Sequence, residues 1–355
     1  SGPFKAHPRT LRTGVLRIPR RISCRRPFSM LAHAAACSRP IAVDSSAVRR
    51  GTRGISDGTL SRQTAAGRAS ATTLHSSSPS SVVTTMAAGV EVDVAAIIVG
   101  GGRVGQALAG MAGPGVADVI LRRGDVFPAS APPGPIYVCT RNDALQGVVD
   151  SVPVARREDL VFLQNGMLQP WLDARALGDN TQALIYFAVA KLGEKPTDGI
   201  TDNNPEGLTA ANGKWAGALA ARLASGGMTC HVLDRDTFTG SMYEKLIWIC
   251  AFMAVGTAHP GSTVGDVERT HGDEVVALIE ELMAGSTNAR GVTFEAGTVT
   301  RLMAYARAVA HFPTAVKELE WRNGFFHAIS AEAKAAGELD PFPKHTAILE
   351  QVGAV

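Results

Sequence analysis

Long apolar runs and paired cysteines are both missing from this sequence of 355 residues. No uncharged apolar run approaches the ~18–20 residues that a membrane-spanning helix needs, so we expect no membrane association. Three cysteines lie beyond residue 90, and Cys139, Cys230 and Cys250 are far apart and in apolar surroundings. An odd number at such spacing is typical of reduced core residues and argues against a disulfide or zinc framework.

Acidic residues are nearly absent from the first 90 positions, where 14 Lys and Arg residues and only two Asp give a net charge of +12. The remaining 21 basic and 30 acidic residues give 91–355 a net charge of −9, so we expect no nucleic-acid binding. Residues 1–90 are also rich in Ser, Ala and Thr, which is typical of an organelle transit peptide, with an ordinary disordered leader as the alternative. We expect a chloroplast rather than a mitochondrial protein, or a cytoplasmic one if translation starts at Met86.

The segment 94–108, VAAIIVGGGRVGQAL, is the most informative stretch of the chain. Apolar residues run into Gly100, Gly102 and Gly105, which have the spacing G-x-G-x-x-G, and a helical pattern follows from Arg103 to Met111. Glycines let the backbone approach a pyrophosphate, and the amides of the new helix then face its charge, so the order predicts dinucleotide binding. Ordinary turn chemistry is the alternative, because this motif alone is a weak signal.

Two arginines indicate which nicotinamide cofactor to expect. Residues 117–121 read as a second strand, and Arg122 and Arg123 follow it about 20 residues past the glycine turn. An acid at this position would bind the ribose diol of NAD, whereas an arginine pairs with the 2′-phosphate of NADP, so the sequence favours NADPH. A solvated pair of surface arginines is the alternative.

Polar residues also follow the next two predicted strands, 136–140 and 161–163. Thr140 and Arg141 end the first, and Asn165 comes shortly after the second, although an everyday Asn-Gly turn would also explain Asn165. Ligands of parallel sheets collect outside the carboxyl ends of the strands, so we expect these side chains near the cofactor. The expected cofactor-binding residues are Gly100, Gly102, Arg103, Val104, Gly105, Arg122, Arg123, Thr140 and Arg141.

The pattern predicts an α/β Rossmann-like domain over 91–235 and an all-α domain over 236–355. In the first domain, residues 183–190 read as a strand, 191–212 as a loop, 214–224 as a helix and 229–233 as a last short strand.

The predicted all-α domain holds a candidate catalytic lysine and a later helix that carries acidic residues. The predicted helix 241–255 is apolar nearly all round and contains Lys245, whose pKa burial would lower toward that of a proton donor. A first-turn lysine reaching water is the alternative for Lys245. A later predicted helix, 314–329, carries Glu318 and Glu320, and two acids on a helix are typical of a solvated face unless a partner binds them.

Four segments in order resemble the ketopantoate reductases (2-dehydropantoate 2-reductases): the glycine turn, Gln164–Met167, Tyr243–Leu246 and Lys317–Gly324. The resemblance covers about 93–350. It implies a Rossmann domain joined to a helical domain of the 6-phosphogluconate dehydrogenase type, with NADPH in the cleft. It also implies the catalytic residues Lys245, Glu318 and Asn165: Lys245 protonates the alkoxide, Asn165 orients the carbonyl, and Glu318 accepts a substrate hydroxyl.

Two positions depart from that family, because Ile249 and Met253 stand where its members usually have asparagines. The resemblance implies ketopantoate or a related branched 2-keto acid as the substrate, with pantothenate biosynthesis as the context. The alternatives are an NADP-binding protein without catalytic activity and a different β-hydroxyacid dehydrogenase on the same plan. A homodimer is a further expectation.

Overall fold

The computed structural model describes residues 92–131 and 133–355. The predicted leader at 1–90 lies outside these residues, so its transit-peptide and localisation hypotheses stay predictions. Among the described helices, none combines the length and apolar character needed to cross a membrane.

In the described residues, seven strands form one sheet in the order β2-β1-β3-β4-β5-β6-β7. The first five are parallel, β6 runs antiparallel to β5, and β7 runs parallel to β6. The short apolar runs that form the inner strands are buried on both faces, as parallel sheets require. The strands are β1 (Ile97–Val99), β2 (Val119–Leu121), β3 (Ile136–Val138), β4 (Leu160–Phe162), β5 (Thr181–Leu184), β6 (Ala210–Asn212) and β7 (His231–Val232).

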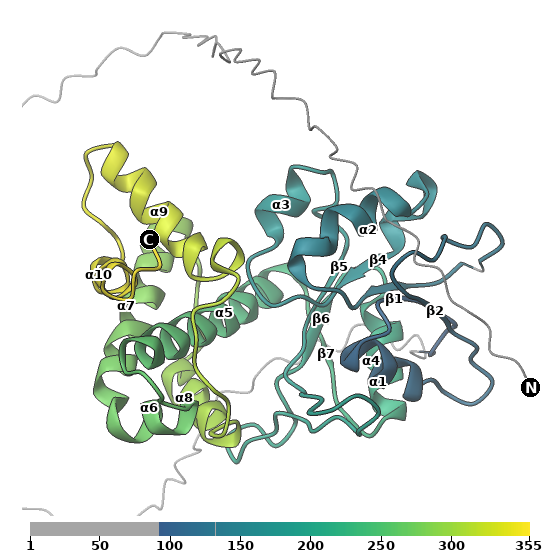
Figure 1. Ribbon diagram of the computed structural model, residues 1–355, viewed down its shortest axis with the longest axis horizontal. Helices are drawn as coiled ribbons and strands as arrows, with labels where there is room; N and C mark the ends of the chain where they lie inside the picture. Colours follow the sequence, from purple (N-terminus) through teal and green to yellow (C-terminus); the bar gives the residue numbers. More distant parts are fainter. Residues whose placement is uncertain (1–91, 132) are drawn as a thin grey trace, which may run out of the picture. The chain divides into compact units, whose positions relative to one another are not determined.

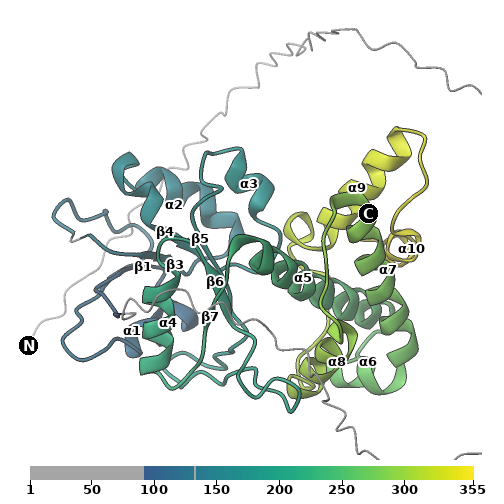
Figure 2. The same cartoon turned by 180° about the vertical axis from the view of Figure 1, so that it is seen from behind.

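Helices cover both faces of this sheet, with α1 (Arg103–Gly110) and α4 (Ala216–Ser225) on one and α2 (Leu145–Ser151) and α3 (Gln169–Asp173) on the other (Figure 1). Successive strand residues point to opposite faces, so Ile98 packs in the core under α1 and α4 while Ile97 packs in the core under α2 and α3. Figure 2 shows the same layers from behind. The predicted Rossmann-like arrangement is confirmed. Two 3-10 helices flank α2 in the sequence: η1 (Asn142–Ala144) precedes it and η2 (Val154–Asp159) follows it.

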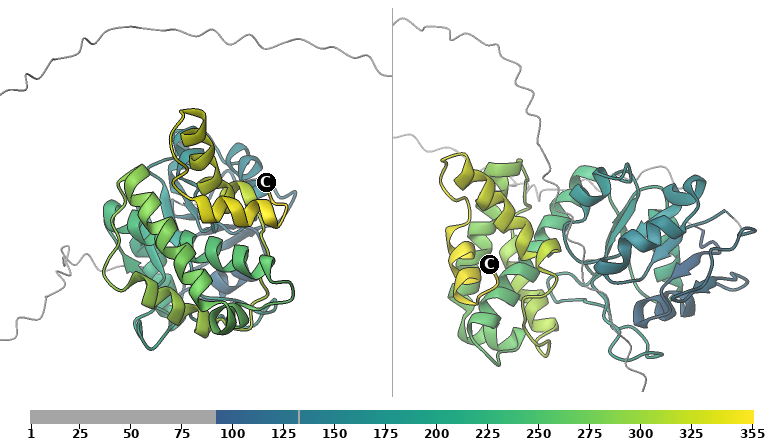
Figure 3. Two further views of the ribbon diagram at one scale, coloured as in Figure 1. Left: turned by 90° about the vertical axis from the view of Figure 1, so that its left-hand side faces the viewer. Right: turned by 45° about the horizontal axis from the view of Figure 1, so that its top comes forward.

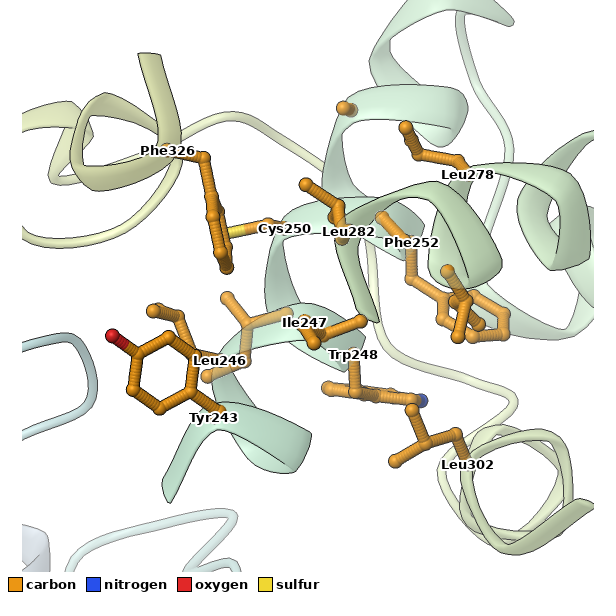
Figure 4. Packing of buried hydrophobic residues seen from close by; sticks show 14 of the residues in the cluster. Tyr243, Leu246, Ile247, Trp248, Cys250, Phe252, Leu278, Leu282, Leu302 and Phe326 are labelled. Atoms are coloured by element: carbon orange, nitrogen blue, oxygen red, sulfur yellow. The ribbon is translucent and has the colours of Figure 1, made fainter. Parts of the chain in front are cut away.

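From Arg235 onward the described regular elements are helical (Figure 3). The long helix α5 runs through the middle of this half, and side chains from α7, α8 and α9 converge on it (Figure 4). Its core also includes Leu184 and Ala210 of the sheet, so α5 packs directly against β5 and β6. The elements are α5 (Arg235–Ala258), α6 (Val264–Thr270), α7 (Gly272–Arg290), α8 (Thr298–Ala308), η3 (Leu319–Trp321), α9 (Asn323–Ala335) and α10 (Pro343–Gln351).

A buried ion cluster fixes the amino-terminal edge of the sheet, opposite the glycine turn. Arg222 of α4 is fully buried and its guanidinium pairs with Asp93, just before β1, at 2.8 Å and with Asp118, just before β2, at 2.5 Å. Because each buried charge has a partner, the cluster joins α4 to the starts of both strands.

Four predicted elements need correction. The central helix begins at Arg235 rather than 241, because the Asp234 side chain accepts a hydrogen bond from the Thr237 amide at 2.9 Å and caps the helix there. The predicted loop 191–212 ends in strand β6, and the predicted strand 183–190 leaves the sheet after Leu184. The predicted helix 314–329 is wrong in its first half: the α-helix begins at Asn323, after the short 3-10 helix η3.

Candidate active site

The glycine turn between β1 and α1 has the sterics of a close-packed phosphate loop. Gly100 has φ +109°, and a Cβ there would lie 2.8 Å from the Cys139 carbonyl oxygen. A Cβ on Gly105 would lie 2.0 Å from the Gly100 carbonyl oxygen, so only glycine lets α1 pass this close to the turn. Gly102, by contrast, has open space where its Cβ would be, which leaves room for a ligand at the amino terminus of α1.

The two arginines after β2 differ in their placement. Both side chains are exposed. Arg122 leans over the glycine turn, since its Cγ and Nε would lie 3.5 and 3.6 Å from a Cβ on Gly101. Its own amide donates to Asp125 at 2.7 Å, which fixes the backbone after the strand. Arg122 is therefore the arginine that the structure places against the turn.

The end of β3 also meets the turn. The Thr140 methyl lies 3.2 Å from the Cβ position of Gly100, and its hydroxyl oxygen is buried with no hydrogen-bond partner among the described residues. Arg141 is exposed and pairs with Asp143 at 2.7 Å, as a surface ion pair does. Asn142, which the sequence reading missed, is buried, and its side-chain amide donates to the Asn165 carbonyl at 3.0 Å.

A cleft of about 640 Å³ lies between the carboxyl edge of the sheet and the helical half. Arg103 lines this cleft, and its guanidinium donates to the carbonyls of Val189 and Ala190, which also line it, at 3.0 Å each. Residues from both halves of the chain meet in this cleft, among them Arg103, Val104, Asn165, Lys245, Lys317 and Arg322.

Lys245 lies in the interior of α5 and not in a first turn, so the hypothesis of a lysine reaching water is wrong. It is 6% exposed, and its ammonium donates to the Ile185 carbonyl and lies 4.6 Å from the centre of the Tyr186 ring. Among the described residues it forms no ion pair with an acid. Burial, reinforced by the positive charge of Arg322, lowers the pKa of Lys245 from 10.5 to about 7. An ammonium in this state gives up a proton readily near neutral pH.

Asn165 and Arg322 reach the same cleft because two distant segments are pinned together. Gly166 has φ +124°, and the next amide, that of Met167, donates to the Trp321 carbonyl at 2.7 Å. A Cβ on Gly166 would lie 2.5 Å from that same carbonyl oxygen, so the approach requires glycine. The contact places the turn after β4 against η3.

Glu318 has a different setting from the one the sequence suggested. It lies outside the predicted helical conformation, at φ +49°, and its carboxylate pairs with the Arg322 guanidinium. Within the described part of the chain it is not among the residues that line the cleft, whereas Arg322 is. Its role as an acceptor of a substrate hydroxyl stays a prediction.

Part of the cleft lining is apolar. We call Trp248, Ile249, Met253, Tyr305 and Phe312 the apolar wall, since all five line the cleft beside Lys245. The indole N–H of Trp248 is buried there without a hydrogen-bond partner among the described residues.

Comparisons with known proteins point to one fold. No protein-family model matches the sequence, and no curated protein matches it. A PanE/ApbA-family ketopantoate reductase from Ralstonia eutropha JMP134 is 17% identical with a TM-score of 0.52, over 73% of this chain and 99% of that one. The dimeric ketopantoate reductase of Staphylococcus aureus is 18% identical with a TM-score of 0.52, over 74% and 98% of the two chains.

A third solved structure, D-mandelate dehydrogenase with NADH and anilino(oxo)acetate, is 15% identical with a TM-score of 0.52, over 73% of this chain and 97% of that one. The described α/β sheet followed by a helical half therefore has the fold of the ketopantoate reductases and of this dehydrogenase, as the sequence predicted.

Proposed function

We propose that the protein is an NADPH-dependent oxidoreductase that reduces a 2-keto acid to the 2-hydroxy acid. The observation that carries this proposal is Lys245, a buried ammonium with no acidic partner among the described residues, in a cleft that also receives the helix after the glycine turn. The solved structures with this fold are named as ketopantoate reductases and as a dehydrogenase with NADH, which supports a nicotinamide cofactor.

The cofactor region fits a dinucleotide in three respects. Gly100 and Gly105 keep the turn free of side chains, and the amino terminus of α1 at Gly102 is open. The buried Thr140 hydroxyl lacks a partner among the described residues, so it can hydrogen-bond a ligand. Arg122 at the turn carries the preference for the additional phosphate of NADPH over NADH.

The side chains of the cleft can then divide the chemistry. A reduced nicotinamide, when bound, supplies a hydride to the carbonyl carbon. The Lys245 ammonium is held in place by its hydrogen bond to the Ile185 carbonyl. It gives a proton to the carbonyl oxygen of the substrate and becomes a neutral amine. Asn165 is held in place through Asn142 and orients the carbonyl with its amide.

An NADP-binding protein without catalytic activity is the second candidate, and Ile249 and Met253 favour it because they bring no polar group to the substrate. Full-length protein assayed for NADPH oxidation with a panel of branched 2-keto acids separates the two. We expect turnover, and we expect Lys245→Ala to lower kcat by about 10²–10⁴-fold, while the exposed control Lys334→Ala leaves it unchanged. Tight NADPH binding without turnover on the whole panel would select the second candidate. NADPH-linked oxidation of 3-hydroxy acids would point instead to a different β-hydroxyacid dehydrogenase.

In its most specific form, this proposal names ketopantoate as the substrate, pantothenate biosynthesis as the context and a homodimer as the assembly.

We also propose that residues 1–90 direct the protein to the chloroplast. A fluorescent protein fused behind these residues should accumulate there, and a fusion that begins at Met86 should stay in the cytosol.

A further inference from the structure

Arg322 is a cationic group that the proposed chemistry leaves unused. Its side chain is 17% exposed and lines the same cleft as Lys245. One terminal nitrogen, Nη2, donates to the Glu318 carboxylate, while Nε is buried without an acceptor among the described residues. A guanidinium has five N–H donors in a planar fork, so the pair with Glu318 satisfies only part of it.

Pairing with Glu318 restrains one end of this guanidinium. Glu318 occupies Nη2 of the guanidinium and is not among the described residues that line the cleft, whereas Arg322 is. A ligand carboxylate in the cleft would accept charge-assisted hydrogen bonds from the remaining N–H groups of Arg322. The planar guanidinium of arginine suits this pairing with a carboxylate.

The apolar wall sets a second condition on the ligand. Ile249 and Met253 offer only hydrocarbon and a thioether, and the rings of Trp248 and Tyr305 pack edge-to-face with centres 4.7 Å apart. A ligand hydroxyl that lies against Ile249 and Met253 would be buried there without a partner, which costs binding free energy, whereas an alkyl or aryl group at the same place would be stabilised.

We propose that the cleft selects 2-keto acids whose side chain is bulky and apolar, with Arg322 binding the carboxylate and the apolar wall receiving the side chain. This inference rests on the proposed function. It assigns Arg322 a substrate-binding role beyond its ion pair, and it predicts that ketopantoate, with its hydroxyl, is a poor ligand.

Two keto acids that differ by one hydroxyl group test the apolar wall in the full-length protein. We expect kcat/KM for 3,3-dimethyl-2-oxobutanoate to exceed that for ketopantoate by about 5- to 100-fold, because the ketopantoate hydroxyl would be buried against Ile249 and Met253, which offer it no partner. A preference for ketopantoate would overturn this part of the inference.

A second pair of ligands tests Arg322. We expect Arg322→Gln to raise KM and the calorimetric Kd for 3,3-dimethyl-2-oxobutanoate by about 10- to 100-fold and to leave those for its methyl ester unchanged. A merely structural role would change both ligands alike and would overturn the assignment, as would unchanged acid binding. Arg322→Lys keeps a positive charge near Glu318 but lacks the planar guanidinium, so it should restore the stability of the fold more than the affinity for the acid. Arg307→Gln, at an exposed arginine, is the control. If the wild-type protein binds the keto acid in an Arg322-dependent way but does not turn it over, the proposed function is wrong and the binding role of Arg322 still holds.

Discussion

Replacing Lys245 with methionine should make the folded protein more stable while removing its activity. Burial holds the pKa of Lys245 at about 7 in the folded protein, against 10.5 for an exposed lysine. At about 1.4 kcal/mol for each pH unit, the folded state bears a cost of up to about 5 kcal/mol for its buried ammonium. Methionine has nearly the same length, carries no charge and suits the surrounding rings, so this cost should disappear.

The sign of the pH dependence follows from the lowered pKa. Below pH 7 the lysine is protonated in both states, and the folded state bears the full cost of the buried charge. Between pH 7 and 10.5 the folded lysine is neutral while the unfolded one still holds its proton, so the wild type gains stability as the pH rises. The advantage of Lys245→Met should therefore be largest below pH 7 and shrink steadily toward pH 10.

Urea unfolding at pH 6, 8 and 10 measures this difference, with the exposed Lys334→Met on α9 as the matched control. The Lys245 variant should also lose about 10²–10⁴-fold in kcat, because it has no proton to give. If the variant is less stable than the wild type at pH 6, or if its advantage does not change with pH, then Lys245 is not a buried, unpaired ammonium. The assignment of the general acid would lose its physical basis.

Three further changes test other parts of the structure. Arg122→Ala should weaken NADPH binding by about 10- to 100-fold in a fluorescence titration and leave NADH binding unchanged, with a smaller effect for Arg123→Ala; equal losses for both cofactors would contradict a phosphate contact. Gly105→Ala should abolish NADPH binding, because its Cβ would lie 2.0 Å from a backbone oxygen, whereas Gly110→Ala on the same helix has open space and should bind normally. Arg222→Met should lower the free energy of unfolding by about 3–5 kcal/mol in urea, since it leaves two buried aspartates unpaired, and an unchanged midpoint would show that the cluster contributes nothing.

The elements that the sequence predicted well are those whose signals are local. The glycine turn and α1 follow from a spacing that any reader can find, and the helix begins at Arg103 as expected. Apolar residues on nearly every side of its helix indicated burial of Lys245, but the predicted start at 241 left a first-turn lysine as the alternative, which the observed start at Arg235 excludes. The true start of α5 also had a local signal, an aspartate cap at Asp234 followed by Thr237, which the composition of the later apolar stretch obscured.

Strand β6 lacked such a signal. Ala210–Asn212 has neither β-branched nor aromatic residues, and it becomes a strand only because β5 and β7 supply hydrogen-bond partners on both sides. Pairing of this kind depends on segments about 20 or more residues apart, so a window of local sequence does not contain it.

The setting of Glu318 and Arg322 shows the same limit at the site itself. Local propensity predicts a helix through both residues, yet the Trp321 carbonyl instead accepts a hydrogen bond from Met167, a residue of the sheet half. That bond commits η3 to the turn after β4, so the chain reaches α9 only at Asn323 and Glu318 adopts a left-handed conformation. This changes the chemistry of the site, because Arg322 lines the cleft with Lys245 and does not lie on the surface of the predicted helix. A tertiary contact thus decides which charged side chain meets the ligand, and the cleft gains a guanidinium in a segment where the sequence singled out only a carboxylate.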